Sequence, residues 1–138
     1  MPACISPDPG GGHPGFLPYA PLRGELLGLP TAEWVARCNA LAARLGLRSA
    51  AGAPLEFFVA APTQGALGYE AEILRHGRIA CRPTGRGALH DLHNALAWLT
   101  FPQVKATLNR LHFAEAETRR TNRPAPRGEG AAGRGRAG

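Results

Sequence analysis

Residues 88–112 read ALHDLHNALAWLTFPQVKATLNRLH, and this stretch decides the fold. Leucines recur there at the spacing of one helix face, which predicts a helix over residues 88–100 that buries them. Pro102 disfavours helical backbone at the residue before it and suits the first position of a second helix, over residues 102–118. The stretch therefore predicts a helix–bend–helix unit. The expected buried side chains are Leu89, Leu92, Leu96 and Leu99 in the first helix and Val104, Leu108 and Leu111 in the second.

Each of these helices also carries a row of polar side chains. Because side chains advance by about 100° per residue, three polar residues of the first helix share one side with Trp98, which we expect to belong to the core. Three more share one side of the second helix. If the chain folds back at Pro102, the two rows meet beside the core. The candidate catalytic residues are His90, Asp91, Asn94, Lys105, Asn109 and His112.

These residue types suit several kinds of chemistry. Imidazole titrates near neutral pH, so His90 and His112 could act as general bases or, with Asp91, as metal ligands. Lys105 could bind an anionic group. The spacing matches no metal-binding motif such as HExxH. A purely structural interpretation stays open, in which the acid and the amides cap helices or join them by hydrogen bonds.

The rest of the folded region predicts short elements. A helix over residues 31–46 would begin with Thr31 as its N-cap and stop at Gly46. The aromatic and β-branched run at residues 55–60 predicts a strand. A short helix over residues 69–76, closed by a glycine, and an extended piece at residues 78–82 follow. The fold class is therefore α+β and mainly helical, with one or two short strands. The expected buried stripe of the helix over residues 31–46 is Trp34, Cys38, Leu41 and Leu45.

The two ends of the chain differ from its centre. Proline and glycine crowd residues 1–29, which predicts an arm without regular structure. Residues 119–138 hold six arginines and one glutamate, a net +5 of the chain's +6, and no large apolar side chain. We expect that tail to be disordered and able to bind nucleic acid weakly through phosphate contacts. Residues 30–118 remain as one small domain. The candidate nucleic-acid-binding residues are Arg119, Arg120, Arg123, Arg127, Arg134 and Arg136.

Composition also bears on location. No apolar run approaches the roughly 20 residues that a membrane-spanning helix needs, so we expect no membrane association. Three cysteines without a CxxC pair indicate reduced thiols and a cytoplasmic protein. The residues indicate no particular cofactor or protein partner.

The pattern Tyr69-Glu70, Gly77 and above all the string from His90 to His112 resembles a bacterial family known as domain of unknown function 3025. The resemblance covers residues of about 30–116, the front part of the family's domain. It implies no established activity. Members continue with a second apolar half, so the resemblance implies a truncated, incomplete domain over residues 30–118.

The sequence alone thus assigns no activity to the chain. One alternative is a metal-assisted hydrolase that uses His90, Asp91 and His112. A second is a nucleic-acid-binding module that acts through the basic tail. A third is a structural or interaction domain.

Overall fold

A computed structural model describes residues 18–61 and 68–125 of the chain. It confirms a mainly helical α+β fold with two short strands. Among the described residues, none of the helices combines the length and the apolar character needed to cross a membrane. The elements are α1 (Ala20–Leu26), α2 (Thr31–Leu45), β1 (Glu56–Val59), α3 (Tyr69–His76), β2 (Arg78–Cys81), α4 (Gly85–Thr100) and α5 (Pro102–Thr121).

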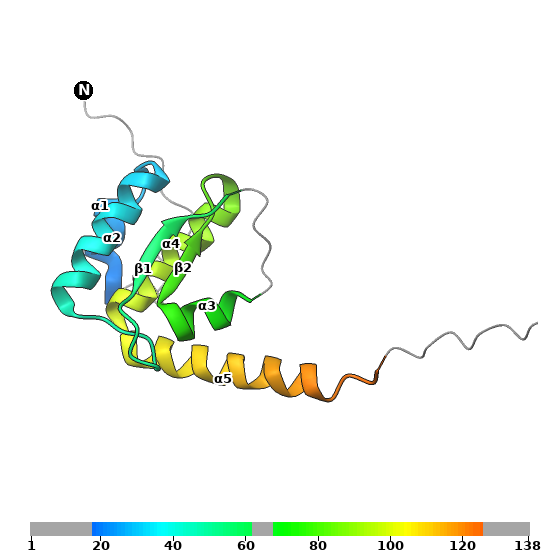
Figure 1. The fold of residues 1–138 in the computed structure, drawn as a ribbon. Helices are drawn as coiled ribbons and strands as arrows, with labels where there is room; N and C mark the ends of the chain where they lie inside the picture. The colour runs from blue at the N-terminus through cyan, green and yellow to red at the C-terminus, as the bar shows by residue number, and fades with distance from the viewer. Residues whose placement is uncertain (1–17, 62–67, 126–138) are drawn as a thin grey trace, which may run out of the picture.

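The two strands run parallel and form one small sheet, in which Phe57 pairs with Ile79. Parallel strands cannot be joined by a tight turn, so the chain crosses between them through α3. Helix α2 packs against β1 and α4 packs against β2. Figure 1 shows that α5 begins at the end of α4, below the strands, and that α3 lies beside α5. The last turns of α5 project from the body.

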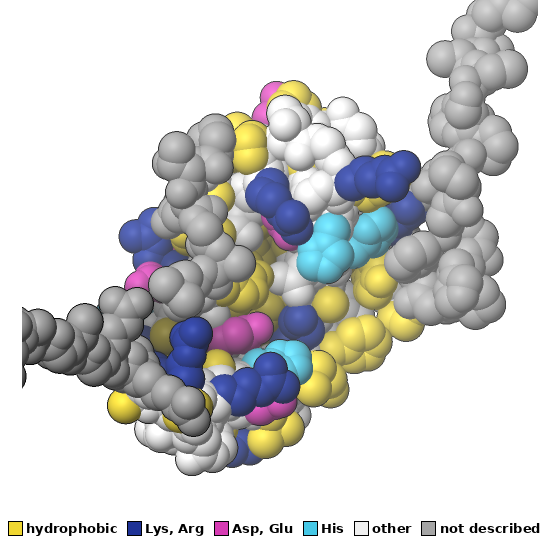
Figure 2. All heavy atoms as spheres, turned by 90° about the vertical axis from the view of Figure 1, so that its right-hand side faces the viewer, with side chains coloured by type: hydrophobic (Ala, Val, Ile, Leu, Met, Phe, Trp, Pro, Cys, Tyr) yellow, Lys and Arg dark blue, Asp and Glu magenta, His cyan; other side chains and the backbone are white. Residues whose placement is uncertain are grey.

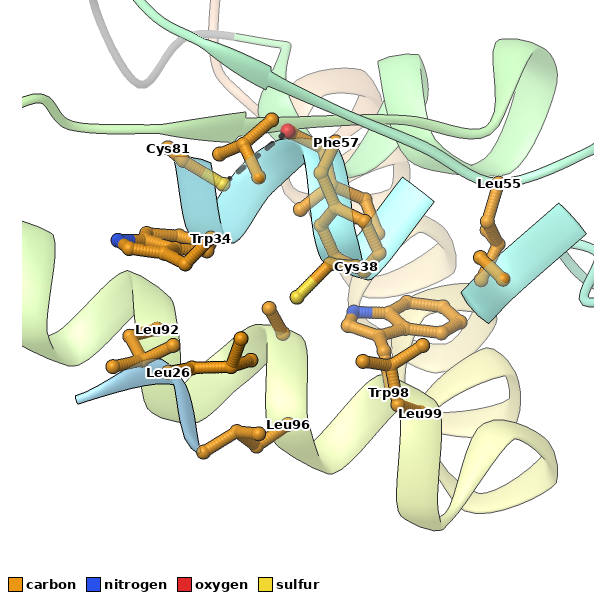
Figure 3. Packing of buried hydrophobic residues seen from close by; sticks show 14 of the residues in the cluster. Leu26, Trp34, Cys38, Leu55, Phe57, Cys81, Leu92, Leu96, Trp98 and Leu99 are labelled. Atoms are coloured by element: carbon orange, nitrogen blue, oxygen red, sulfur yellow. Dashed lines mark hydrogen bonds between the residues drawn. The ribbon is translucent and has the colours of Figure 1, made fainter. Parts of the chain in front are cut away.

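The core lies between the sheet, α2 and α4. Figure 3 shows two residues of α2 pointing toward α4, with Trp34 above Leu92 and Cys38 between Phe57 and Trp98. Burial raises the pKa of the Cys38 thiol to about 12, and that of the Cys81 thiol likewise, because a thiolate would lose its hydration there. Both cysteines are free and buried, so they act as small apolar side chains of the core.

The N-terminal part of the fold corrects three expectations. Residues 20–26 form a helix rather than an irregular arm, because Pro21 lies in the first turn, where it is tolerated, and Leu26 is buried in the core. Thr31 is not the N-cap of α2, because its hydroxyl instead donates to the backbone oxygen of Pro83 at 2.9 Å. Leu45 is 53% exposed, so the buried face of α2 ends at Ala42.

The helix–bend–helix unit is present, and Leu92, Leu96 and Leu99 are buried as expected. Leu89 is 44% exposed, which contradicts its assignment to the core. Helix α5 runs to Thr121, so the expected tail begins with residues that are still helical.

The buried stripe expected on α5 is wrong. Its three apolar residues, Val104, Leu108 and Leu111, are 41–57% exposed. The helix instead turns Ala106 and Asn109 toward the body, because the small alanine allows close packing and the asparagine forms hydrogen bonds with α3. Helical periodicity shows that apolar residues share a face but does not show what covers that face.

Gly77, directly before β2, packs closely against the segment that precedes β1, and this close packing can be tested. Its φ is +68°, and a Cβ there would lie 2.0 Å from the backbone oxygen of Pro54. We expect Gly77→Ala to lower the free energy of unfolding by more than Gly46→Ala, which has a similar φ of +64° but open space around it. The control should cost only the left-handed strain of about 1–2 kcal/mol. Equal losses in urea unfolding would contradict the close packing at Gly77.

Candidate functional site

The first polar row of the site is fixed by Asp91, near the start of α4. Asp91 is 8% exposed and accepts three hydrogen bonds from Arg82, which follows β2. They come from the backbone N–H at 2.8 Å, from Nε at 2.9 Å and from Nη2 at 3.0 Å. His90 Nδ1 lies 3.2 Å from Asp91 Oδ1. The end of β2, the α4 carboxylate and the neighbouring imidazole therefore form one group.

Two opposing effects act on the ionisation of Asp91. Burial raises its pKa, but hydrogen bonds from the Arg82 side chain and backbone and from His90 favour the carboxylate, and the net pKa is lowered from 3.8. The Arg82 guanidinium in turn has a raised pKa, chiefly through its hydrogen bond with Asp91. Both groups are therefore charged at neutral pH, and the positive charge of Arg82 is already paired with the Asp91 carboxylate.

One turn further along α4, Asn94 contacts the start of α3. Its Nδ2 donates to the Tyr69 hydroxyl oxygen at 3.2 Å. Burial, followed by the negative charge of Asp91, raises the pKa of Tyr69, so this phenol stays protonated. Asn94 and Tyr69 thus place a neutral hydrogen-bonding pair between α4 and α3.

The second polar row, on α5, meets α3 at Glu70. Asn109 is 3% exposed, and its Nδ2 donates both to the backbone oxygen of Glu70 at 3.0 Å and to the Glu70 carboxylate. His112 Nδ1 lies 3.6 Å from the other carboxylate oxygen. Glu70 therefore links an amide and an imidazole that stand three residues apart on α5.

Lys105 stands apart from these pairs. Its ammonium lies 5.8 Å from the centroid of the Trp98 ring, at the upper end of cation–π range. Burial lowers the pKa of Lys105, an effect that the negative charge of Glu70 partly offsets. Within residues 18–61 and 68–125, Lys105 has no ion pair within 4 Å. It is a partly desolvated cation without a carboxylate partner in that part of the chain.

These groups surround one cavity of about 520 Å³. Figure 2 shows histidine, acidic and basic side chains gathered around a hollow on this face of the molecule. The volume lies in the range of pockets that hold small molecules. The cavity is lined by Ala60, Tyr69, Glu70, Ile73, Ala80, Arg82, His90, Asp91, Asn94, Trp98, Lys105, Leu108, Asn109 and His112.

All six candidate catalytic residues lie in this lining, so the two rows do face one cavity. Sequence reasoning missed Tyr69, Glu70 and Arg82, which approach from α3 and from the end of β2. Tyr69 and Glu70 belong to the pattern that carries the family resemblance, and that was the only signal available for them. Nothing near Arg82 in the sequence indicates its contact with Asp91.

The proposed metal ligands are not gathered in one place. His90 lies against Asp91, whereas His112 lies against Glu70. In the described part of the chain, no group of three or more histidine, cysteine, aspartate or glutamate side chains is placed to hold a metal ion. The donor geometry therefore does not favour the metal-assisted mechanism.

The candidate nucleic-acid-binding arginines fall into two sets. Arg119 pairs with Glu115 and Arg120 pairs with Glu117 on α5, and Arg123 follows the helix as an exposed residue. These three arginines line a second cavity, of about 890 Å³, beside Phe113. Arg127, Arg134 and Arg136 lie outside the described residues. Two of the six positive charges are thus already paired within the helix.

The contact between Arg82 and Asp91 predicts a pH effect on stability. Because the pKa of Asp91 in the folded chain lies below 3.8, this contact stabilises the fold above about pH 3.8 and is lost as the pH falls through the lower, folded value. We expect Arg82→Met to raise the pKa of Asp91 in carboxyl NMR titrations and to reduce stability at pH 7. Arg86→Met, an exposed change on the first turn of α4, is the control. An unchanged Asp91 titration would contradict this account.

Comparison with known proteins places this site in a family. The model of a family described as a protein of unknown function (DUF3025) matches residues 55–132, from the first strand through α5. The match begins and ends later than the resemblance over residues 30–116. No curated protein and no solved structure matches the chain. The family model covers more than half of the chain's residues, including every residue that lines the cavity. The chain therefore belongs to the DUF3025 family.

Proposed function

We propose that the chain binds a small molecule with a carboxylate or phosphate group in the cavity between α3, α4 and α5, and that Lys105 binds that group. The observation that carries the proposal is the contrast between Lys105 and the other basic side chains of the lining. Arg82 and His90 contact Asp91, and His112 contacts Glu70. Lys105 has no such partner among the described residues.

The physical argument rests on desolvation. A partly buried ammonium loses hydration, and that loss lowers the pKa of Lys105. An anion bound beside it would restore a charged partner in a setting where electrostatic attraction is less screened than in water. The neighbouring amides of Asn94 and Asn109 and the phenol of Tyr69 supply neutral polar groups that orient a ligand without competing for its charge.

The histidines extend this proposal toward catalysis. Each imidazole has a carboxylate oxygen near its Nδ1, at 3.2 Å for His90 and 3.6 Å for His112, and with the proton on Nδ1 the other nitrogen, Nε2, would be able to take a proton from a substrate. Acid–base chemistry on the bound anion is therefore the activity that the lining supports best.

A bacterial source and a cytoplasmic setting, which the sequence led us to expect, belong to the same proposal.

Anion binding is tested on the full chain with inorganic phosphate, sulfate and succinate at constant ionic strength and pH 7. We expect at least one of them to raise the thermal unfolding midpoint and to give saturable binding by calorimetry. Lys105→Met should weaken that binding about tenfold to a hundredfold, since a hydrogen bond to a charged group contributes about 1.5–3 kcal/mol. Arg110→Met, on an exposed part of the same helix, should leave it unchanged. Failure of all three anions, or equal effects of the two substitutions, would refute the proposal.

The pH dependence of binding gives an independent check. Only the protonated ammonium attracts an anion, and the pKa of Lys105 lies below 10.5. Affinity for sulfate, whose own charge is constant in this range, should therefore decline at a lower pH than for an exposed lysine. Titration calorimetry between pH 7 and pH 10.5 measures this decline. Constant affinity across the range would mean that a different cation holds the anion.

A further inference from the structure

Asn109, one of the residues that line the cavity, carries a second polar atom without a partner among the described residues. Its side-chain oxygen Oδ1 is buried and has no hydrogen-bond partner in the part of the chain that the structure describes. It is the one buried side-chain nitrogen or oxygen in that condition among the described residues. A buried acceptor without a donor is unfavourable, so such atoms in folded proteins usually have a reason.

The orientation of the Asn109 amide is fixed by its other end. Both partners of Nδ2, the Glu70 backbone oxygen and the Glu70 carboxylate, accept hydrogen bonds and cannot donate them. Exchanging the nitrogen and oxygen of the amide would place Oδ1 against these two acceptors. The amide therefore keeps its nitrogen toward Glu70, and Oδ1 remains an acceptor in a side chain that lines the cavity.

Asn109 also stands four residues after Lys105 on α5. Side chains at this spacing lie on the same side of a helix, with Cβ atoms about 5–6 Å apart. Lys105 Nζ offers positive charge and Asn109 Oδ1 offers a lone pair. A molecule that satisfies both groups needs an anionic group and a hydrogen-bond donor within a few bonds of each other.

We infer that the ligand of this cavity is a small hydroxylated anion, whose anionic group lies at Lys105 and whose hydroxyl donates to Asn109 Oδ1. A second carboxylate cannot take the position of the hydroxyl, because it has no proton to donate at neutral pH. The positive charge of Lys105 one turn away disfavours an ammonium donor there, whereas the Glu70 carboxylate beside the Asn109 amide favours one, so the test below includes an ammonium donor. This inference rests on the proposed function and specifies its ligand class.

Three dicarboxylates that share a four-carbon backbone test the inference without any substitution in the protein. Succinate has no donor, malate adds one hydroxyl, and 2-methoxysuccinate keeps that oxygen but lacks its proton. We expect malate to bind about threefold to tenfold more tightly than succinate, the range of one neutral hydrogen bond, and 2-methoxysuccinate to bind no better than succinate. Equal affinity for malate and succinate would overturn the inference and leave anion binding intact. Tighter binding of aspartate than of malate would also overturn it, in favour of an ammonium donor.

The position of the hydroxyl is tested by NMR of the side-chain amides. The Asn109 amide signals should shift on addition of malate and much less on addition of succinate, whereas the Asn39 amide, which is bonded to the Phe57 backbone and is not part of the cavity lining, serves as a control that neither ligand shifts. Asn109→Ala should reduce the ratio of malate to succinate affinity toward one, even if its overall affinity falls. A hydroxyl preference without any response at Asn109 would overturn the assignment to this residue. Absence of binding by every dicarboxylate and by phosphate would instead refute the proposed function.

Discussion

The structure depends on one hydrogen-bonded contact, between the Asn109 amide of α5 and Glu70 at the start of α3. Helix α5 buries little apolar surface, because Val104, Leu108 and Leu111 remain largely exposed. Its attachment to the body therefore relies on a polar contact and on small residues such as Ala106. That attachment brings Lys105 over Trp98 and closes one side of the cavity. Without it, the second polar row would have no fixed position relative to the first.

A second polar contact fixes the opposite wall. Asp91 of α4 holds both the backbone and the side chain of Arg82, so the end of β2 cannot move away from α4 without leaving a buried carboxylate unpaired. Both contacts serve two purposes at once, since the residues that join the elements also line the cavity. The polar side chains of α4 and α5 can therefore join the helices by hydrogen bonds and also line the cavity, so the structural and the functional interpretation are compatible.

The sequence predicted those parts of the fold that depend on local rules. Pro102 set the bend, Gly77 ended α3, and the apolar spacing of α4 identified Leu92, Leu96 and Leu99 as core residues. It failed where burial depends on distant partners. Periodicity could not show that the apolar stripe of α5 remains exposed. For the same reason the polar rows could be listed from the sequence, whereas Glu70 and Arg82, which reach them from other elements, could not.

The most direct test of this account is whether α5 lies against the body in solution. Nuclear Overhauser effects between the Trp98 ring protons and the side-chain methylenes of Lys105 report that arrangement, because the ammonium lies 5.8 Å from the ring centroid. The account predicts that these effects are observed in the free chain, together with contacts between Asn109 and Glu70. Their absence in a chain whose Trp34 and Phe57 signals still show a packed core would contradict it, because α5 would then be detached and the cavity would lack one wall.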